Sequence, residues 1–389
     1  MKKYLFILVT AVSFAQSVNK TMNLLPDTGQ TNSYTATFGE DNDYNINVPS
    51  YTNNNNGTIT DIVTGLMWQQ TDGGEMTIDN AFIYANNLVL AGFSDWRLPS
   101  PKESFGILNH QNNNPALNTT YFTNTNAGYW WTNTYQVGDN TKVWTTNAGG
   151  GIGNKPKSET ISAGGTFKFH ARCVRDVNVA LIVAHFLDNG NGTITDNLTQ
   201  LIWQKVPSTT PLSWENAIAY AESLSLTNAT DWRLPNIKEL QSLNDENLAN
   251  PSVNQTYFST IGTKNYWSST SVQNQILNSW YWNTQYGITT FAAKTATNYV
   301  MCVKGNPVNL AANAVDIYPK RNVYPNPFLS KIFIENIVGD ELYEMYNNIG
   351  QLIFEGKNIE KQDFSGLQKG IYFLEINGES VSKIKLIKE

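Results

Sequence analysis

Two stretches of the chain place apolar residues three and four positions apart, with mostly polar residues between them. This spacing puts the apolar side chains on one face of an α-helix, so we expect an amphipathic helix in each stretch. The apolar stripes consist of Ile78, Ala81, Phe82, Ala85 and Leu88 in the first stretch and of Trp214, Ala217, Ile218, Ala221 and Leu224 in the second.

The sequence around these two helices has the composition of short β-strands. An Asn-Gly pair, which is a hairpin-turn signal, stands at Asn56-Gly57 and again at Asn191-Gly192. Each pair is followed by a β-rich run that ends in Leu66-Met67-Trp68 or Leu201-Ile202-Trp203. Beyond each helix the chain is aromatic, interrupted by glycines and again β-like. Helices followed by a run of short strands predict an α+β fold.

These two sets of elements belong to an internal repeat. The sequence from Asn56 to Asp61 returns from Asn191 to Asp196, an offset of 135 residues. Later landmarks keep nearly the same offset, and Cys173-Val174 and Cys302-Val303 close the two copies. A period this long indicates two tandem globular domains, because solenoid repeats are only about 20–50 residues long.

Each copy contains an Asp-Trp-Arg-Leu-Pro turn that leads into a second, short helix. Ser100 and Asn236 are placed to cap these helices, with Glu103 and Glu239 three residues later to complete a capping box. We interpret the triplet as a structural motif, with a partly buried ion pair and an indole in the core. A binding or catalytic role is the alternative. The residues concerned are Asp95, Trp96 and Arg97 in the first copy and Asp231, Trp232 and Arg233 in the second.

Composition and charge narrow the class of protein. Charged residues make up only 15% of the chain, and a net charge of −6 with a pI near 5.2 argues against nucleic-acid binding. Residues 1–15 have the basic, apolar and small-residue segments of a secretory signal peptide. The sequence contains no apolar run of about 20 residues, so we expect no transmembrane segment. We therefore expect an exported protein.

The repeat resembles the Lcl C-terminal domain family, which is named for a bacterial collagen-like adhesin. The resemblance rests on Gly-Thr-Ile-Thr-Asp, Thr64-Gly65-Leu66-Met67-Trp68-Gln69, the Asp-Trp-Arg-Leu-Pro turn and the closing Arg172-Cys173-Val174-Arg175. It covers about 22–177 and 184–305, and the second copy departs from it at Gln200. It implies two tandem domains of the C-type lectin-like fold, and a surface-exposed binding module, in some members for polysaccharide.

The end of the chain resembles the type A C-terminal sorting domain of the type IX secretion system. The resemblance rests on Val323-Tyr324-Pro325-Asn326-Pro327, on Asn348-Ile349-Gly350-Gln351 and on Gly366 to Phe373. After a linker at 306–320, residues 321–389 alternate strand-like runs with turns, which predicts a small all-β sandwich. The resemblance implies contact with the type IX secretion machinery and export across the outer membrane, followed by release or retention on the cell surface.

The sequence offers little for catalysis. His110, His170 and His185 have no spacing typical of a catalytic triad or a metal site, and we interpret them as ordinary surface or strand residues. Cys173 and Cys302 are expected to be buried, with an inter-domain disulfide as the alternative. The loop from Asp188 to Asp196 lacks the calcium-loop register, so a hairpin is expected there. We predict a non-enzymatic protein without cofactor or metal.

Aromatic residues remain as candidates for a binding site. In the β-rich half of each copy they are either core residues or a platform on which sugar rings stack, with Asn283 as a hydrogen-bonding neighbour. We favour an adhesin-like protein that binds a polysaccharide or a surface glycan; the alternatives are a structural or protein-binding surface protein and, third, an enzyme. The candidate ligand-binding residues are Trp130, Trp131, Trp144, Trp267, Trp280, Tyr281, Trp282 and Asn283.

Overall fold

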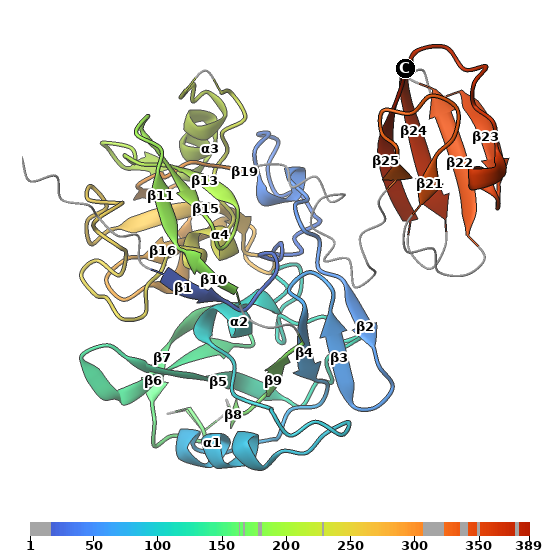
Figure 1. The fold of residues 1–389 in the computed structure, drawn as a ribbon. Helices are drawn as coiled ribbons and strands as arrows, with labels where there is room; N and C mark the ends of the chain where they lie inside the picture. The colour runs from blue at the N-terminus through green and yellow to red at the C-terminus, as the bar shows by residue number, and fades with distance from the viewer. Residues whose placement is uncertain are drawn as a thin grey trace, which may run out of the picture. The chain divides into compact units, whose positions relative to one another are not determined.

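The computed structural model describes residues 17–389 except 163, 166–167, 178–180, 228, 306–322, 335–340, 348–350 and 378–380. The predicted signal peptide and the predicted linker at 306–320 lie outside the described residues. The chain forms two compact units, Met1–Asn306 and Pro307–Glu389 (Figure 1). The first unit contains both repeats.

The first repeat is built from two small sheets and two short helices. One antiparallel sheet has the strand order β2-β3-β4-β9, and the other has the order β7-β6-β5-β8, in which β8 runs parallel to β5. The strands are β2 Tyr51–Asn53, β3 Thr58–Asp61, β4 Leu66–Gln69, β5 Ala127–Gln136, β6 Asp139–Asn147, β7 Ile152–Pro156, β8 Lys168–His170 and β9 Val174–Asp176, and the helices are α1 Ile78–Asn87 and α2 Pro101–Gly106.

The second repeat has the same order of elements. Its sheets have the strand orders β11-β12-β13-β19, β15-β16-β17 and β14-β18. The elements are β11 Phe186–Asp188, β12 Thr193–Asp196, β13 Leu201–Gln204, β14 Leu212–Ser213, α3 Trp214–Glu222, α4 Ile237–Ser242, β15 Asn265–Ser271, β16 Asn278–Asn283, β17 Ile288–Ala293, β18 Thr297–Asn298 and β19 Val303–Gly305. Between the repeats, β1 Ser17–Lys20 pairs with β10 Leu181–Ala184.

The local predictions for helices and hairpins are confirmed. Ile78, Ala81 and Ala85 of α1 are buried, as are the corresponding residues of α3. Both predicted capping boxes are present at the starts of α2 and α4. The two Asn-Gly turns join β2 to β3 and β11 to β12, so the loop from Asp188 to Asp196 is the expected hairpin.

The predicted fold class is wrong. The four α-helices of the described residues contain only 10, 6, 9 and 6 residues, whereas the strands number 25 and are spread over many small sheets. The protein is therefore mainly β, and not an α+β structure of C-type lectin-like type. The physical reason is that the apolar stripes span fewer than three helical turns, and the long aromatic segments between them pair as strands.

The two repeats contact each other through equivalent elements. Helix α2 packs on α4, and β7 packs on β17, so each element meets its own counterpart in the other repeat. This is the pattern of a two-fold related, isologous interface. One core cluster runs across the contact and includes Phe105 and Leu117 of the first repeat and Leu240 and Trp280 of the second.

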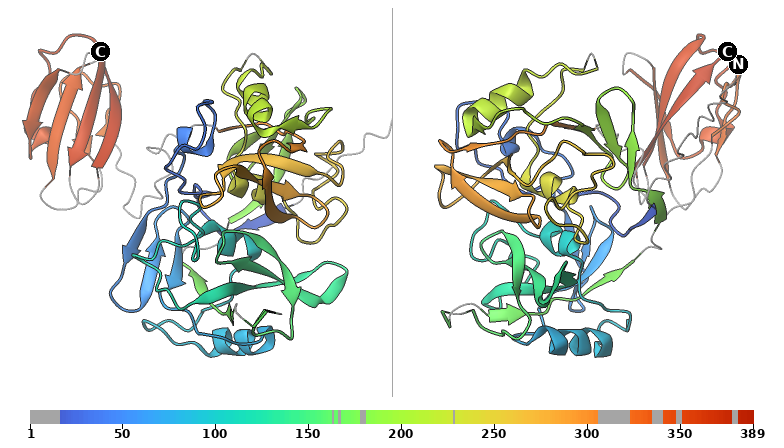
Figure 2. Two further views of the ribbon diagram at one scale, coloured as in Figure 1. Left: turned by 180° about the vertical axis from the view of Figure 1, so that it is seen from behind. Right: turned by 90° about the vertical axis from the view of Figure 1, so that its left-hand side faces the viewer.

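The segment before the first repeat lies against the second repeat (Figure 2). It contains a short 3-10 helix, η1 Asp41–Asp43. Asp41 Oδ2 accepts a hydrogen bond of 2.6 Å from Thr270 Oγ1, and Glu40 Oε1 accepts one of 2.5 Å from Ser271 Oγ. The segment therefore joins the two repeats into one unit.

The second unit is a four-stranded antiparallel sheet with a two-stranded ribbon. The sheet has the order β23-β22-β24-β25, and the ribbon pairs β20 with β21. Phe328, Tyr343 and Leu374 lie in its core. Its elements are β20 Val323–Tyr324, β21 Phe333–Ile334, β22 Leu342–Asn347, β23 Leu352–Gly356, η2 Ile359–Lys361, β24 Gly370–Asn377 and β25 Val381–Lys388.

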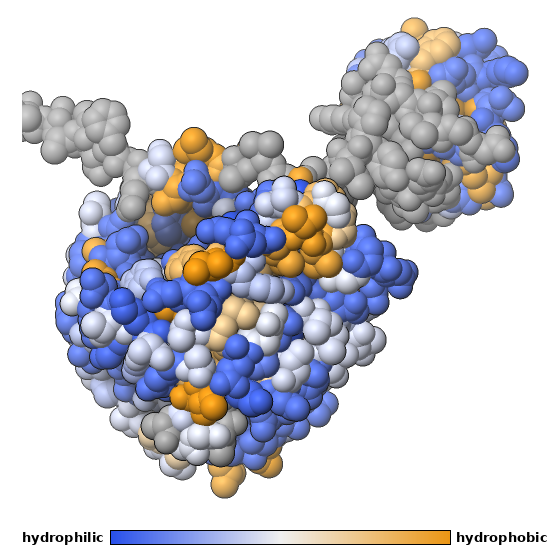
Figure 3. All heavy atoms as spheres, turned by 90° about the horizontal axis from the view of Figure 1, so that it is seen from below, coloured by the Kyte–Doolittle hydropathy of each residue, from blue (hydrophilic) through white to orange (hydrophobic). Residues whose placement is uncertain are grey.

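The surface is mainly polar on the face that the space-filling view shows (Figure 3). The face drawn in Figure 3 is mostly hydrophilic, with scattered apolar patches. Among the described residues, no helix has the length and apolarity that crossing a membrane requires.

Candidate functional site

The tryptophans predicted to form a sugar platform lie in the core. Trp131, Trp267 and Trp282 are 0% exposed, and Trp130 and Trp280 are 5% exposed. Trp144 is 1% exposed. None of these rings has a free face for a sugar, so they cannot form the predicted platform. Tyr281 and Asn283 are only partly exposed.

The central strands are covered on both faces, which explains this burial. Adjacent residues on a strand point to opposite sides of a sheet. Trp130 therefore points to one face and belongs to the core that the repeats share, whereas Trp131 points to the other face and belongs to the cluster under α1. Both faces are buried. Their indole N–H groups also have partners inside the fold, at 3.0 Å from Asp72 Oδ2 and 2.8 Å from Met76 O.

The Asp-Trp-Arg motif is structural, but its ion pairs differ from the prediction. Trp96 is buried as expected, and its Nε1 donates to Leu90 O. Arg97 does not pair with Asp95. Its guanidinium instead binds both carboxylate oxygens of Glu103, at 2.8 and 2.9 Å, and Asp176 at 2.7 Å. Although burial alone would raise the pKa of Glu103, Arg97 lowers it.

The second repeat has the same arrangement in a more buried setting. Arg233 binds both oxygens of Glu239, at 2.6 and 2.5 Å, while Asp231 faces Lys304 at 3.5 Å. Trp232 is 1% exposed. The two side chains of the Arg233–Glu239 pair are each 5% exposed, whereas the side chain of Arg97 is 30% exposed.

The histidines are buried, which corrects their interpretation as surface residues. Burial lowers the pKa of both His110 and His185 to about 3. His170 lies on β8 as a strand residue, with Nδ1 at 2.8 Å from Asp72 Oδ1.

The cysteines are free and buried, so they form no inter-domain disulfide. Burial raises the pKa of Cys173 to about 12 and that of Cys302 well above its ordinary value. Both predicted interior positions are confirmed.

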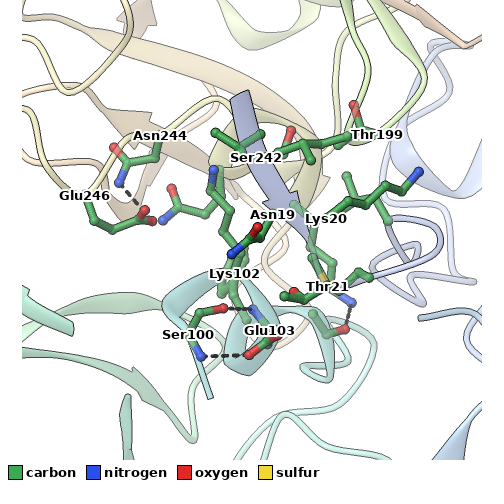
Figure 4. Close-up of a pocket in the computed structure, with 18 of the residues that line it drawn as sticks. Asn19, Lys20, Thr21, Ser100, Lys102, Glu103, Thr199, Ser242, Asn244 and Glu246 are labelled. Carbon is green, nitrogen blue, oxygen red and sulfur yellow. Dashed lines mark hydrogen bonds between the residues drawn. The ribbon is translucent and has the colours of Figure 1, made fainter. Parts of the chain in front are cut away.

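A cavity of about 450 Å³ lies between the two repeats. Its walls come from β1, from α2 of the first repeat, and from α4 and the loop 243–247 of the second. In Figure 4, Ser100, Lys102 and Glu103 lie on one side of the cavity, and Thr199 and Ser242 lie opposite them. Both repeats are therefore needed to form it.

The cavity lining is rich in amides, hydroxyls and charged groups of both signs. It includes the cations Lys20 and Lys102 and the carboxylates Asp245 and Glu246. Gln241 lines the cavity at 1% exposure, and neither its Oε1 nor its Nε2 has a hydrogen-bond partner among the described residues. A buried amide without partners is costly, so its place in a cavity wall points to a polar ligand.

Sequence reasoning missed most of this site. Of the predicted candidates only Arg97 lines the cavity. Lys102 and Gln241 follow the two capped turns, where the sequence signal described helix starts and not binding. The one sequence feature that could have indicated the site is the Lys-Glu dipeptide that both repeats contain, at Lys102-Glu103 and at Lys238-Glu239.

Comparison with known proteins places most of the chain in two families. Residues 57–175 and 192–304 match the Lcl C-terminal domain, and residues 322–389 match the secretion system C-terminal sorting domain. Both resemblances drawn from the sequence motifs are confirmed. The sorting domain marks an exported protein of the cell surface or the medium and implies interaction with the type IX secretion machinery.

No curated protein matches the chain. One solved structure that does is PorZ, described as an essential bacterial surface component of the type IX secretion system of Porphyromonas gingivalis. The two are 14% identical with a TM-score of 0.17, over 25% of this chain and 15% of PorZ.

Proposed function

The chain belongs to the Lcl C-terminal domain family, and from this premise we propose that it is a non-enzymatic protein of the cell surface or the medium that binds carbohydrate. The proposed ligand site is the cavity between the repeats. The polar groups that line this cavity support the choice, and the buried tryptophan rings do not.

The observation that carries the proposal is the unpartnered amide of Gln241 in the cavity wall. Sugars present many hydroxyls, each a donor and an acceptor, and an amide offers two donors and an acceptor in return. Ligand sites of this kind are concave, with a few placed polar groups among apolar ones. The cavity volume of about 450 Å³ lies in the range of such sites.

The state of the nucleophilic side chains supports a binding role over a catalytic one. A thiol reacts as the thiolate, and the raised pKa values of Cys173 and Cys302 keep both protonated. His110 and His185, with pKa values lowered to about 3, stay neutral inside the fold.

The test is a glycan array probed with the full chain, followed by titration calorimetry of the hits. Gln241→Met keeps the length of the side chain and removes its hydrogen-bonding groups. We expect it to weaken binding about ten-fold, which corresponds to one lost buried hydrogen bond. The matched control is Gln285→Met, at an exposed position outside the cavity lining.

Glycan binding that is equally strong in the Gln241 and Gln285 variants would remove the cavity from the proposal. A blank array, together with saturable binding of a surface protein, would replace carbohydrate recognition by protein binding.

A further inference from the structure

Two lysines at equivalent places in the repeats have different surroundings. Lys102 on α2 and Lys238 on α4 both stand three residues after the proline of the Asp-Trp-Arg-Leu-Pro turn. Lys238 is 1% exposed, and its Nζ donates to two main-chain carbonyls, Asp27 O and Gly106 O, both at 2.7 Å. Lys102 lines the cavity, and its Nζ has no hydrogen-bond partner among the residues that the structure describes.

The segment before the first repeat accounts for this difference. It covers the turn of the second repeat, where the Tyr44 ring lies 5.4 Å from the guanidinium of Arg233 and Asp27 supplies the carbonyl to Lys238. In the first repeat, the corresponding residues Arg97 and Lys102 face the cavity. Residues of the same segment, among them Thr21 and Met22, form one wall of this cavity. The difference between the repeats is therefore in the ammonium groups: the segment supplies a carbonyl to Lys238, whereas Lys102 faces the cavity.

The hydrogen bonds of Lys238 indicate which acceptor atoms suit the equivalent Lys102. The ammonium of Lys238 is satisfied by acyl carbonyl oxygens, which are neutral acceptors. The same lysine on the same turn in the first repeat offers the same donors to the cavity. A ligand with a carbonyl oxygen would complete its hydrogen bonds.

Gln241 adds a second requirement for the ligand of this cavity. Its side chain presents an unpartnered acceptor as well as unpartnered donors. A carboxylate or sulfate offers acceptors alone and would leave Gln241 Oε1 unpaired, which is costly in a buried site. A secondary amide offers an N–H and a C=O together. Met22, Leu25 and Phe105 also line the cavity and provide apolar surface for a methyl group.

We propose that the cavity binds an N-acyl group of a glycan, such as the acetamido group of an N-acetylhexosamine. Lys102 Nζ donates to the acyl carbonyl oxygen, and the Gln241 amide pairs with the acyl amide. Lys102 is thereby the residue that determines specificity for acylated sugars. This inference rests on the proposed carbohydrate function of the same cavity and adds the substituent that is recognised.

The experiment uses calorimetry on the full chain with three probes of equal length. These are tetramers of N-acetylglucosamine, of glucosamine with free amines, and of galacturonic acid. We expect the N-acetylated tetramer to bind at least ten-fold more tightly than either of the others. Lys102→Met should remove this preference, with an unchanged melting temperature because Lys102 is only partly buried and unpaired.

Lys157→Met serves as the matched control, since Lys157 is also partly buried and does not line the cavity. Equal binding of the acetylated and free-amine tetramers would overturn the inference and leave carbohydrate binding standing. Tighter, Lys102-dependent binding of the uronic acid tetramer would overturn it in favour of a carboxylate ligand. If none of the probes and no glycan on the array binds, the proposed function itself fails.

Discussion

His110 of the first repeat meets Trp280 of the second in an edge-to-face contact, with ring centroids 5.7 Å apart and planes at 85°. Both side chains are buried, and His110 Nε2 lies 2.9 Å from Gly150 O, so this nitrogen carries the proton and donates it. The contact lies at the core cluster that both repeats share. The repeats are therefore expected to unfold together.

Trp280→Ala should lower the free energy of unfolding by about 3–5 kcal/mol, because it leaves a large cavity between the repeats. Urea denaturation followed by circular dichroism measures this change. Ile276→Ala is the control, since Ile276 is 50% exposed and its truncation should cost little. Two separate transitions in Trp280→Ala, one of them at the original midpoint, would contradict the shared core.

Stability should fall as the pH is lowered below neutrality. Burial and the nearby charge of Lys238 lower the pKa of His110 to about 3, whereas the unfolded chain has a histidine pKa near 6.5. The unfolded state therefore binds the proton first, and the stabilisation is complete above about pH 6.5 and declines as the pH falls towards 3. Between pH 7 and 4.5 we expect His110 to account for a loss of about 2.5 kcal/mol.

The check is a series of urea unfolding curves from pH 7 to 4.5 for the parent chain and for His110→Gln. The variant should lose less stability over this range, although it is less stable than the parent at pH 7. The same pH slope in both proteins would show that His110 does not titrate as described.

The two cysteines should resist alkylation in the folded protein. Both are 0% exposed, and burial raises their pKa values, so little thiolate is present at pH 8. Iodoacetamide labelling followed by mass spectrometry should detect almost no modification in buffer and two modified residues in urea. Rapid labelling of Cys302 in buffer would contradict the buried position.

Removal of residues 321–389 should stop the protein in the periplasm. These residues include the match to the sorting domain, and they belong to a compact unit separate from the repeats. Cell fractionation and surface protease digestion locate the truncated chain. Its appearance on the cell surface at the level of the full chain would refute the sorting role.

Local features were predictable from the sequence because they depend on neighbouring residues. The capping boxes at Ser100 and Asn236, the hairpins and the buried indoles of Trp96 and Trp232 are of this kind. The fold class was not predictable, since the length of α2 and α4 depends on what the chain packs against after each capped turn.

The candidate site was out of reach for a related reason. Alternation along a strand does not reveal that both faces of β5 are covered, so Trp130 and Trp131 resembled a platform. The cavity arises only when α2 docks on α4. The residue pattern within one repeat does not predict a cavity that forms between two repeats.

The segment that covers the turn of the second repeat has a consequence for how such a site could arise. In a dimer of identical chains, whatever seals one half-site seals the other, because symmetry gives both the same sequence and the same neighbours. Joining the halves in one chain removes this restriction. One segment can then bind one of two equivalent lysines, as the main-chain carbonyl of Asp27 binds Lys238. Lys102, its counterpart, can then change its ligand without any change to that hydrogen bond.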